Sequence, residues 1–482
     1  MRQDTIPAST RATSSIAEIF YEILTSRFDL DLEEFEDVAL EAGHKIMASA
    51  FGLALEALDA RLCAEMPDGW RVHDRRTRRL LTKMGDVSYT YRRTRDRHGR
   101  SGLPLAEHLD MPHYDRITPA ARAFLVEAGA EVSYEKAGRL LEKAKGSIVS
   151  ANAVMTSLRE TGALCAEEDA EAAASLYRDG VIPEAEASST QISLENDGTW
   201  IRLQGVEPGE PERVEVKALV AYEGKEVQGG KVVRKNAIRH ACVGSPEAFW
   251  TQGIATVGTK FDLSSLRAVH VGQDGEKWCG RAEEFMPGRI SVTGHLDPFH
   301  VNRAVVRAVS DKGFANRIIG IIMDGDKDAA ICLLEASREM GLASSKHADR
   351  LIAYLKNNID LIGVEGPSLG TMESENQHVY GARMDSVPCA WSRVGASDMA
   401  RIRSRLCSGR KLPHMTREKS ASPKRSIREQ HAELRILEKA GLPASKVVES
   451  VGNGYLPPQA SLVGFSSDVR YRAGLSSAML QI

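Results

Sequence analysis

From about residue 190 the sequence changes to strand-like patterning, and the order of the segments that follow restricts the possible folds most. Three β-rich segments come first, separated by turns rich in Gly, Pro and Glu: residues 191–203, 213–222 and 231–243. Helix-like and strand-like segments then alternate: residues 246–259, 266–271, 275–285, 290–300 and a helix from 301. This β-β-β-α-β-α-β-α order is the ribonuclease-H-like order. The sequence therefore predicts an α/β domain of this kind over residues 190–405.

Three acidic residues stand where such a fold could bring them together. Asp197 lies within the first strand-like segment and Asp274 follows the fourth, each directly before a glycine, while Glu373 lies near the start of a later helix. Carboxylates from two strands and a helix can bridge two divalent ions about 3.5–4 Å apart, an arrangement suited to phosphoryl transfer. We therefore expect Asp197, Asp274 and Glu373 to be both catalytic residues and metal ligands. Two Mg²⁺ or Mn²⁺ ions are the expected cofactor, because these hard cations prefer carboxylate oxygens.

Ordinary structural interpretations of the same residues remain open. Asp-Gly is a common turn dipeptide, and an acid near a helix start complements the helix dipole. Glu375 competes with Glu373 as the third acid, and Asp297, in Leu-Asp-Pro-Phe-His, competes with Asp274 as the second. His300 is interpreted as a structural histidine rather than a ligand.

Positive charge is concentrated in two segments, although the whole chain has a net charge of −3. Residues 71–100 contain eleven Lys/Arg and three acids, and residues 393–425 contain ten Lys/Arg and two acids. Such segregation is typical of a protein with one nucleic-acid-binding face. A nucleic acid is therefore the expected partner, and the helix pair described next favours double-stranded DNA. The arginines expected to contact it are Arg75, Arg92, Arg383 and Arg401.

Residues 71–163 are predicted to form a DNA-binding region. Gly85-Asp86 between two alternating runs predicts a β-hairpin. Capping residues and glycines then predict short helices over 119–130, 134–145 and 151–161. The last two are typical of a helix-turn-helix whose second helix recognises DNA through Asn152, Thr156 and Arg159.

The rest of the chain is assigned from its composition. Residues 1–70 are predicted to be a helical N-terminal region and 164–189 an acidic, Ala-rich linker. Residues 301–362 are predicted to be a helical insertion in the catalytic domain, and 406–482 a basic tail. Seven scattered cysteines without a CxxC pair argue against a disulfide framework or a zinc ribbon. The sequence contains neither a long apolar run nor a signal pattern, so we expect a cytoplasmic, nucleoid-associated protein without membrane contact.

At these residues the chain resembles the ISLre-type insertion-sequence transposases of bacteria, relatives of the Mutator-like DDE transposases. The matching blocks are 116–119, 133–150, 197–201, 272–278, 296–300 and 373–392. The resemblance implies a ribonuclease-H-like domain with a helical insertion and with Asp197, Asp274 and Glu373 as the DDE acids. A Glu followed three positions later by an Asn, here Asn376, is similar to the Mutator-like pattern and favours Glu373 over Glu375. Many Mutator-like enzymes carry a Cys-x-x-His after the second acid, and because this chain lacks it there we predict no zinc site.

The function expected from this resemblance is metal-dependent cleavage and strand transfer at the ends of an insertion sequence. A homo-oligomer assembled on DNA is the expected active form. Two alternatives remain. The chain could be a DDE-type nuclease that only hydrolyses DNA, or a DNA-binding regulator derived from a transposase that has lost catalysis, although the presence of all three acids argues against the regulator.

Overall fold

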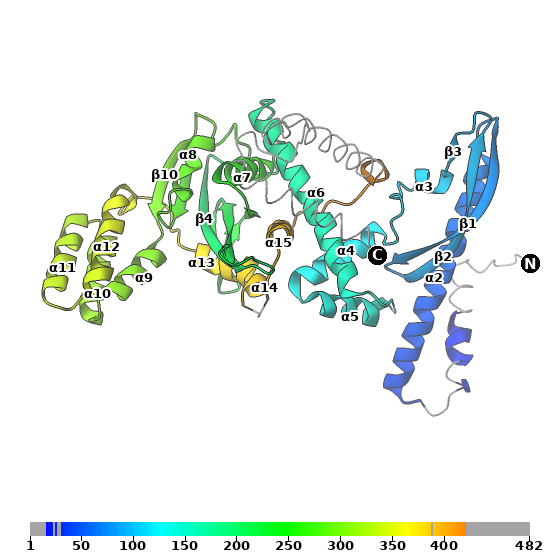
Figure 1. The fold of residues 1–482 in the computed structure, drawn as a ribbon, viewed down its shortest axis with the longest axis horizontal. Helices are drawn as coiled ribbons and strands as arrows, with labels where there is room; N and C mark the ends of the chain where they lie inside the picture. Colours follow the sequence, from blue (N-terminus) through cyan, green and yellow to red (C-terminus); the bar gives the residue numbers. More distant parts are fainter. Residues whose placement is uncertain (1–15, 23–24, 27–29, 146, 387–388, 421–482) are drawn as a thin grey trace, which may run out of the picture. The chain divides into compact units, whose positions relative to one another are not determined.

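The computed structural model describes residues 16–22, 25–26, 30–145, 147–386 and 389–420 (Figure 1). The described residues before Leu158, together with those from His414 to Ser420, form one compact unit, here called the N-terminal unit. Leu158–Pro413 form the second unit. Both contain helices and strands, so the chain has a mixed α/β fold. None of the described helices has the length and apolar character needed to cross a bilayer.

The N-terminal unit is built on a long helix and a long hairpin. Its elements are α2 (Leu32–Ala64), β1 (Trp70–Thr82), β2 (Gly85–Asp96), β3 (Ser101–Gly102), α3 (Pro104–His108), α4 (Pro119–Glu131) and α5 (Tyr134–Lys145). The predicted hairpin is confirmed, with Thr82 paired to Gly85 at the turn. Val87 and Tyr89 are buried against Leu55 of α2, as period-2 alternation requires.

The predicted end of the third short helix, and with it the predicted linker, is wrong. Helix α6 runs without interruption over Ala151–Tyr177, through most of the acidic segment. Gly162 lies inside this helix and does not end it. A Cβ at this position would lie 2.4 Å from the Cβ of Asp398, so a larger residue would clash. This glycine is therefore a close-packing contact between α6 and α15 (Arg393–Cys407), and the Ala-rich sequence beyond it favours helix.

A five-stranded mixed sheet is the centre of the second unit. Its strand order is β10-β9-β4-β5-β8. The strands are β4 (Gln191–Arg202), β5 (Arg213–Tyr222), β8 (Ile238–Cys242), β9 (Ala268–Gln273) and β10 (Ser291–Leu296). β4, β5 and β8 pair antiparallel, whereas β9 runs parallel to β4 and β10 parallel to β9. Helix α7 (Pro246–Lys260), predicted over 246–259, packs its apolar side on the sheet, with Phe249 and Trp250 fully buried.

Two segments of this unit differ from the prediction. The single strand expected over 231–243 is divided into β7 (Lys231–Lys235) and β8, because Asn236 adopts a left-handed conformation with φ 55°. β7 pairs only with β6 (Gly224–Gln228), as a separate hairpin. The helix expected over 275–285 is limited to a 3₁₀ turn at Cys279–Arg281 and to α8 (Ala282–Phe285), since Gly275 has φ 91° and cannot continue a helix.

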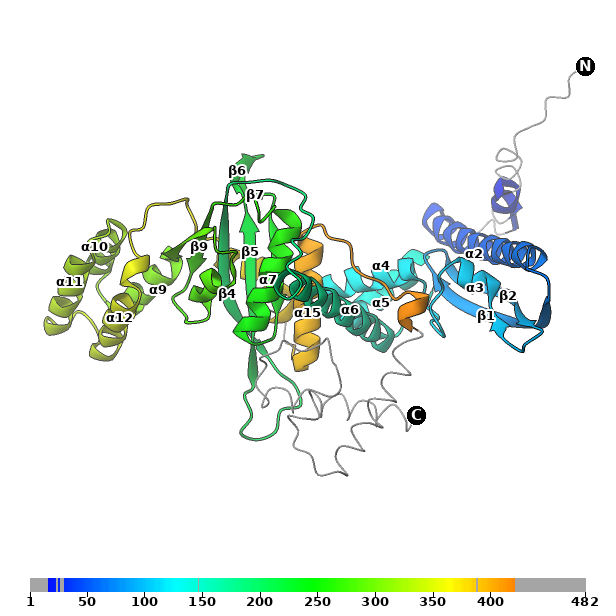
Figure 2. The same cartoon turned by 90° about the horizontal axis from the view of Figure 1, so that it is seen from above.

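The segment predicted as a helical insertion is helical. It contains α9 (Pro298–Ala308), α10 (Lys312–Met323), α11 (Lys327–Glu339) and α12 (Ser345–Asn357). These helices enclose an apolar core of their own that includes Val305, Ile318 and Leu351. In Figures 1 and 2 they lie beyond the β10 edge of the sheet. The chain leaves the sheet at β10, completes this helical block and then reaches α13 (Met372–Glu375), which carries Glu373.

A buried ion cluster fixes α15 against α6. Asp169 of α6 accepts hydrogen bonds from Arg401 and, at 2.7 Å, from Arg405. Burial opposes its ionisation, but Arg401 and neighbouring basic groups outweigh burial and lower the pKa of Asp169 to about 2. The carboxylate therefore stays charged, and its loss would leave two buried guanidinium groups without their shared partner.

We expect Asp169→Ala to lower the free energy of unfolding by about 3–5 kcal/mol, because it removes one side of a buried ion cluster. Glu168→Ala is the matched control: Glu168 also pairs with Arg405, but it is half-exposed, so its loss should cost about 1 kcal/mol or less. Urea denaturation of both variants measures the difference. Equal losses in the two variants would contradict this description of the cluster.

Candidate metal centre

Parallel strand pairing places three aspartates at the same level of the sheet. Gly272 of β9 lies opposite both Glu195 of β4 and His295 of β10. Two residues further along each strand there is an aspartate. The three are Asp197, Asp274 and Asp297. The register continues to this level on the β10 side, because the Asp297 N–H donates to the Gln273 carbonyl at 2.8 Å. Since β9 lies between β4 and β10, Asp274 is the middle position of this row.

A compact group of possible metal ligands lies at the Asp197 end of the row. Three residues each offer one ligand atom, and these three atoms all lie within 4.8 Å of one another: Asp197, His300 and Glu373. They come from β4, from the first turn of α9 and from α13. Asp197 and Glu373 were both expected here. His300 was interpreted as structural, but its Nε2 lies 3.8 Å from Asp197 Oδ2.

Two polar atoms beside Asp197 have unused hydrogen-bonding capacity. Both His300 Nε2 and Asn376 Oδ1 are buried, and neither has a hydrogen-bond partner among the described residues. Buried polar atoms are normally satisfied, so unsatisfied ones at a site indicate a ligand or ion. Carboxylate oxygens together with an imidazole nitrogen can coordinate a divalent cation such as Mg²⁺ or Mn²⁺. The residues present therefore fit a divalent metal.

Asp197 itself is held in a fixed orientation. The side-chain amide of Asn376 donates to Asp197 Oδ2 at 2.8 Å, and the Gly198 N–H donates to Oδ1 at 2.7 Å. Asn376 belongs to a π-helical turn, Asn376–Gly381, that directly follows α13. π-helical turns occur often at functional sites. One continuous segment thus supplies both Glu373 and the amide that orients Asp197.

Asp274 lies beside this group but not within it. Its Oδ1 accepts a hydrogen bond from the Glu276 N–H at 2.9 Å, and its backbone carbonyl accepts one from Tyr354 of α12 at 2.8 Å. Burial, together with the negative charges of Asp274 and Glu373, raises the pKa of Asp197 to about 7, although His300 and the Gly198 N–H oppose the shift. Three carboxylates this close repel one another unless a proton or a cation compensates them. A divalent cation would do so by displacing the proton.

The two candidates for the third acid have different surroundings. Glu375 is buried and forms ion pairs with Arg234, at 2.5 Å, and with Arg239. Its carboxylate is fully engaged by these two arginines. Glu373, two residues earlier on the same short helix, belongs to the group around Asp197. Of the two glutamates, Glu373 is therefore the one placed beside Asp197, whereas Glu375 is engaged in ion pairs.

Contacts to the sheet hold α13 in place. The buried carboxylate of Glu195 on β4 accepts from the backbone N–H groups of Gly370 and Thr371, at 2.8 and 2.6 Å. Arg234 donates to the Thr371 carbonyl at 3.1 Å and also binds Glu375. Because Glu195 is on the same strand as Asp197, this network fixes Glu373 relative to the first aspartate.

Asp297, the rival second acid, has a helix-capping role. Its Oδ1 accepts from the Phe299 N–H at 2.8 Å, and it is the N-cap residue of α9. Pro298 at the first helical position completes a strong helix start. This cap orients the turn that carries His300. The motif Asp-Pro-Phe-His was visible in the sequence, but its histidine could be placed beside Asp197 only through the strand register.

The residues expected to contact DNA have varied environments. Arg75 and Asn152 are exposed. Arg159 is partly buried and lies 3.4 Å from the Ser392 hydroxyl. Arg383 lies over the Trp391 ring, 5.0 Å from its centroid. Of these four residues, Arg75 and Asn152 are therefore the most accessible to a nucleic acid.

Two expected DNA contacts are instead structural. Arg401 is buried, binds Asp169 and donates to Gln252 at 2.9 Å, so its guanidinium faces the protein interior. Arg92 pairs at 2.8 Å with Asp59, which is fully buried. Both assignments were made from local charge density, which does not distinguish a buried ion pair from a surface charge. We therefore no longer assign Arg401 or Arg92 to DNA binding.

Comparison with known proteins gives one family. The sequence model of an uncharacterised protein family, UPF0236, matches residues 26–420. This range contains the hairpin, the sheet, the helical block and every residue of the candidate metal centre. A comparison with curated proteins gave no match.

Proposed function

The chain belongs to the uncharacterised protein family UPF0236, and we propose that it is a transposase that cleaves and joins DNA at the ends of an insertion sequence. The observation that carries this proposal is the metal centre. Asp197, Glu373 and His300 converge, and Asp274 lies at the same level on the neighbouring strand. The sequence resemblance to ISLre-type transposases, over the blocks that contain these acids, favours DNA as the substrate.

The topology of the second unit supports a ribonuclease-H-like assignment. A sheet of three antiparallel strands extended by two parallel strands, in the order β10-β9-β4-β5-β8, is the arrangement expected for such a domain. The helical block between β10 and α13 corresponds to the predicted insertion. It returns the chain to the sheet so that Glu373 lies beside Asp197.

The roles of the individual residues follow from their positions. Two bound Mg²⁺ or Mn²⁺ ions would activate a water or a 3′-hydroxyl and stabilise the leaving oxygen. Asp197, oriented by Asn376 and Gly198, would be a ligand of these ions. Asp274 would contribute from the side of β9, and Glu373 from α13. His300 Nε2 is available as a further ligand or as a hydrogen-bonding group for a phosphate oxygen.

A plasmid assay tests this function. The purified full-length chain is incubated with a plasmid that carries the gene's own flanking DNA, in Mg²⁺, in Mn²⁺ or in EDTA, with an unflanked plasmid as control. We expect cleavage at the flank boundaries and joined products, in either metal and only with the flanked plasmid. Cleavage without joined products would instead identify a hydrolytic nuclease. DNA binding without cleavage in either metal would identify a non-catalytic regulator and contradict the proposal.

A further inference from the structure

The two faces of the β1–β2 hairpin have different surroundings. Side chains of paired residues lie on the same face of an antiparallel ribbon, and successive pairs alternate between faces. Leu80 pairs with Val87, and Arg78 with Tyr89, so these pairs share one face. The pairs Arg79–Ser88, Thr77–Thr90 and Arg75–Arg92 form the other, here called the outer face. The register shift of this hairpin lies beyond Asp74, so the alternation is unbroken over both sets.

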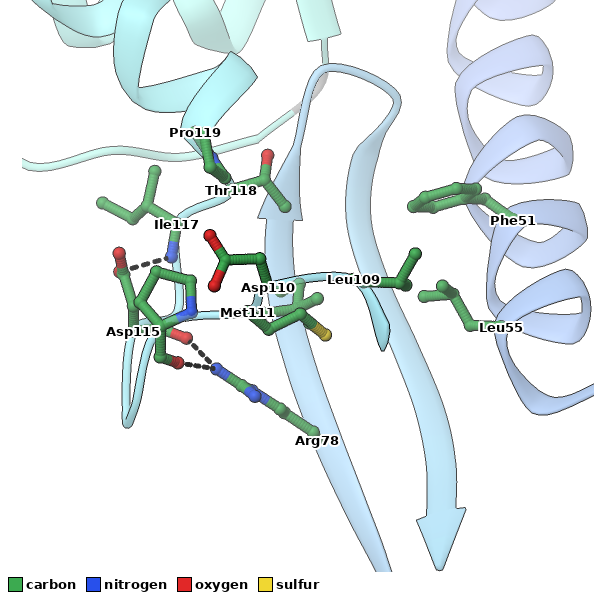
Figure 3. Close-up of a pocket in the computed structure, with 12 residues that line it drawn as sticks. Phe51, Leu55, Arg78, Leu109, Asp110, Met111, Asp115, Ile117, Thr118 and Pro119 are labelled. Carbon is green, nitrogen blue, oxygen red and sulfur yellow. Dashed lines mark hydrogen bonds between the residues drawn. The ribbon is translucent and has the colours of Figure 1, made fainter. Parts of the chain in front are cut away.

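The inner face is used for packing. Leu80, Val87 and Tyr89 are buried in the core of the N-terminal unit. One of the arginines on this face, Arg78, donates to the backbone carbonyls of Pro112 and Asp115, at 3.3 and 2.5 Å (Figure 3). It closes one side of a pocket between β1, α2 and the segment before α4, lined in part by Phe51 and Leu55. The inner face near the turn is therefore occupied by packing within the unit. Arg76, further along the same face, is exposed but pairs with Asp74 at 3.5 Å.

The outer face is polar, cationic and exposed. Arg75, Thr77, Arg79 and Ser88 are all exposed. Arg92 is neutralised by Asp59, so the charge available on this face comes from Arg75 and Arg79. Neither of them has a hydrogen-bond or ion-pair partner among the described residues. Four residues of strand separate them by roughly 13 Å, about four base pairs of duplex at 3.4 Å per step. Thr77 lies between them on β1, and Ser88 lies opposite Arg79 on β2.

We propose that the outer face of the β1–β2 ribbon is the surface that binds double-stranded DNA, entering the major groove. A two-stranded ribbon fits a groove about 12 Å wide. Arg75 and Arg79 contact phosphates, and Thr77 and Ser88 contact base edges. This inference rests on the proposed function for its partner, and it assigns DNA recognition to the ribbon instead of to the helix over 151–161.

The structure of that helix argues against it as the recognition element. Residues 151–161 are the first part of the 27-residue helix α6, which continues into the second unit. Arg159, expected to recognise bases, is partly buried and lies beside Ser392. A recognition helix presents several side chains of one face to base edges. Of the residues proposed for that role only Asn152 is fully exposed.

Salt-dependent binding by the full-length chain tests the phosphate contacts. Fluorescence anisotropy is measured with a labelled random-sequence duplex in EDTA, so that catalysis plays no part. The slope of log K against log[salt] should become shallower by about 1.8 in Arg75→Gln/Arg79→Gln, because each lost phosphate contact removes about 0.9. Arg75→Lys/Arg79→Lys should retain most of the slope. Lys45→Gln/Arg61→Gln removes two exposed charges from α2 and should leave the slope unchanged.

A neutral variant tests base recognition. Thr77→Val/Ser88→Ala should leave the salt slope for the random duplex unchanged. It should also bring the ratio of the affinity for flank duplex to the affinity for random duplex towards one. Asn152→Ala should retain this ratio. An unchanged slope in the arginine-to-glutamine variant, or loss of discrimination only in Asn152→Ala, would overturn the proposal. Failure of the wild-type chain to bind any duplex would refute the proposed function itself, which is a different outcome.

Discussion

Asp197→Asn should reduce the rate of DNA strand cleavage by about a thousandfold or more, because it removes the central charge of the metal centre, where metal ions supply several kcal/mol of transition-state stabilisation. The substitution is nearly isosteric and keeps an oxygen for the Gly198 N–H. Folding should therefore be preserved. Asp274→Asn and Glu373→Gln should have effects of the same order, since a two-ion site needs ligands on both sides.

Single-turnover cleavage of the flanked plasmid in Mg²⁺ measures these rates. Thermal unfolding and duplex affinity in EDTA should stay close to wild type in all three variants. Glu339→Gln, an exposed acid on α11, is the matched control and should cleave normally. Near-wild-type cleavage by Glu373→Gln would remove this residue from the metal centre.

Glu375→Ala should have the second-largest effect, which is a loss in the free energy of unfolding. For strand cleavage, the sequence predicts that Glu375→Ala matters much less than Glu373→Ala. The structure adds an effect on stability, because Glu375 neutralises both Arg234 and Arg239 in a buried position. Removing one partner of a buried ion pair costs about 3–5 kcal/mol. Glu373→Ala breaks no ion pair among the described residues and should relieve repulsion with Asp197.

The two glutamates should therefore give opposite patterns. Glu375→Ala should lower the urea midpoint strongly, and any protein that remains folded at low temperature should still bind Mn²⁺. Glu373→Ala should keep its urea midpoint and lose Mn²⁺ affinity. Isothermal titration with Mn²⁺ and urea denaturation of both variants separate the two roles. If folded Glu375→Ala lost Mn²⁺ binding while Glu373→Ala retained it, Glu375 would be the metal ligand and Glu373 would not.

Local pattern was sufficient to predict most of the secondary structure. Alternating runs around Gly85 predicted the β1–β2 hairpin, the segment 213–222 matched β5, and the helix predicted over 246–259 differs from α7 by one residue at its end. Gly162 misled the prediction, since a glycine is compatible both with a helix end and with close packing against Asp398. Only the tertiary contact distinguishes the two.

Only part of the candidate site could be predicted, because local pattern shows some of its residues and tertiary contacts the others. Asp197 and Asp274 were recognised because each stands at a strand next to a glycine. That His300 belongs with them depends on the parallel register of β9 and β10, which no local pattern shows. The reverse error affected Arg92 and Arg401. Each lies in a basic segment, but an aspartate distant in the sequence neutralises it.

The central claim is that Asp197, Asp274 and Glu373 hold two divalent ions. Anomalous diffraction from crystals of the full-length chain soaked in Mn²⁺ tests it most directly. We expect two peaks about 3.5–4 Å apart, with Asp197 touching both, Asp274 touching one and Glu373 the other. A single peak held by Asp197, His300 and Glu373 without Asp274, or no peak within reach of Asp197, would contradict the two-metal account.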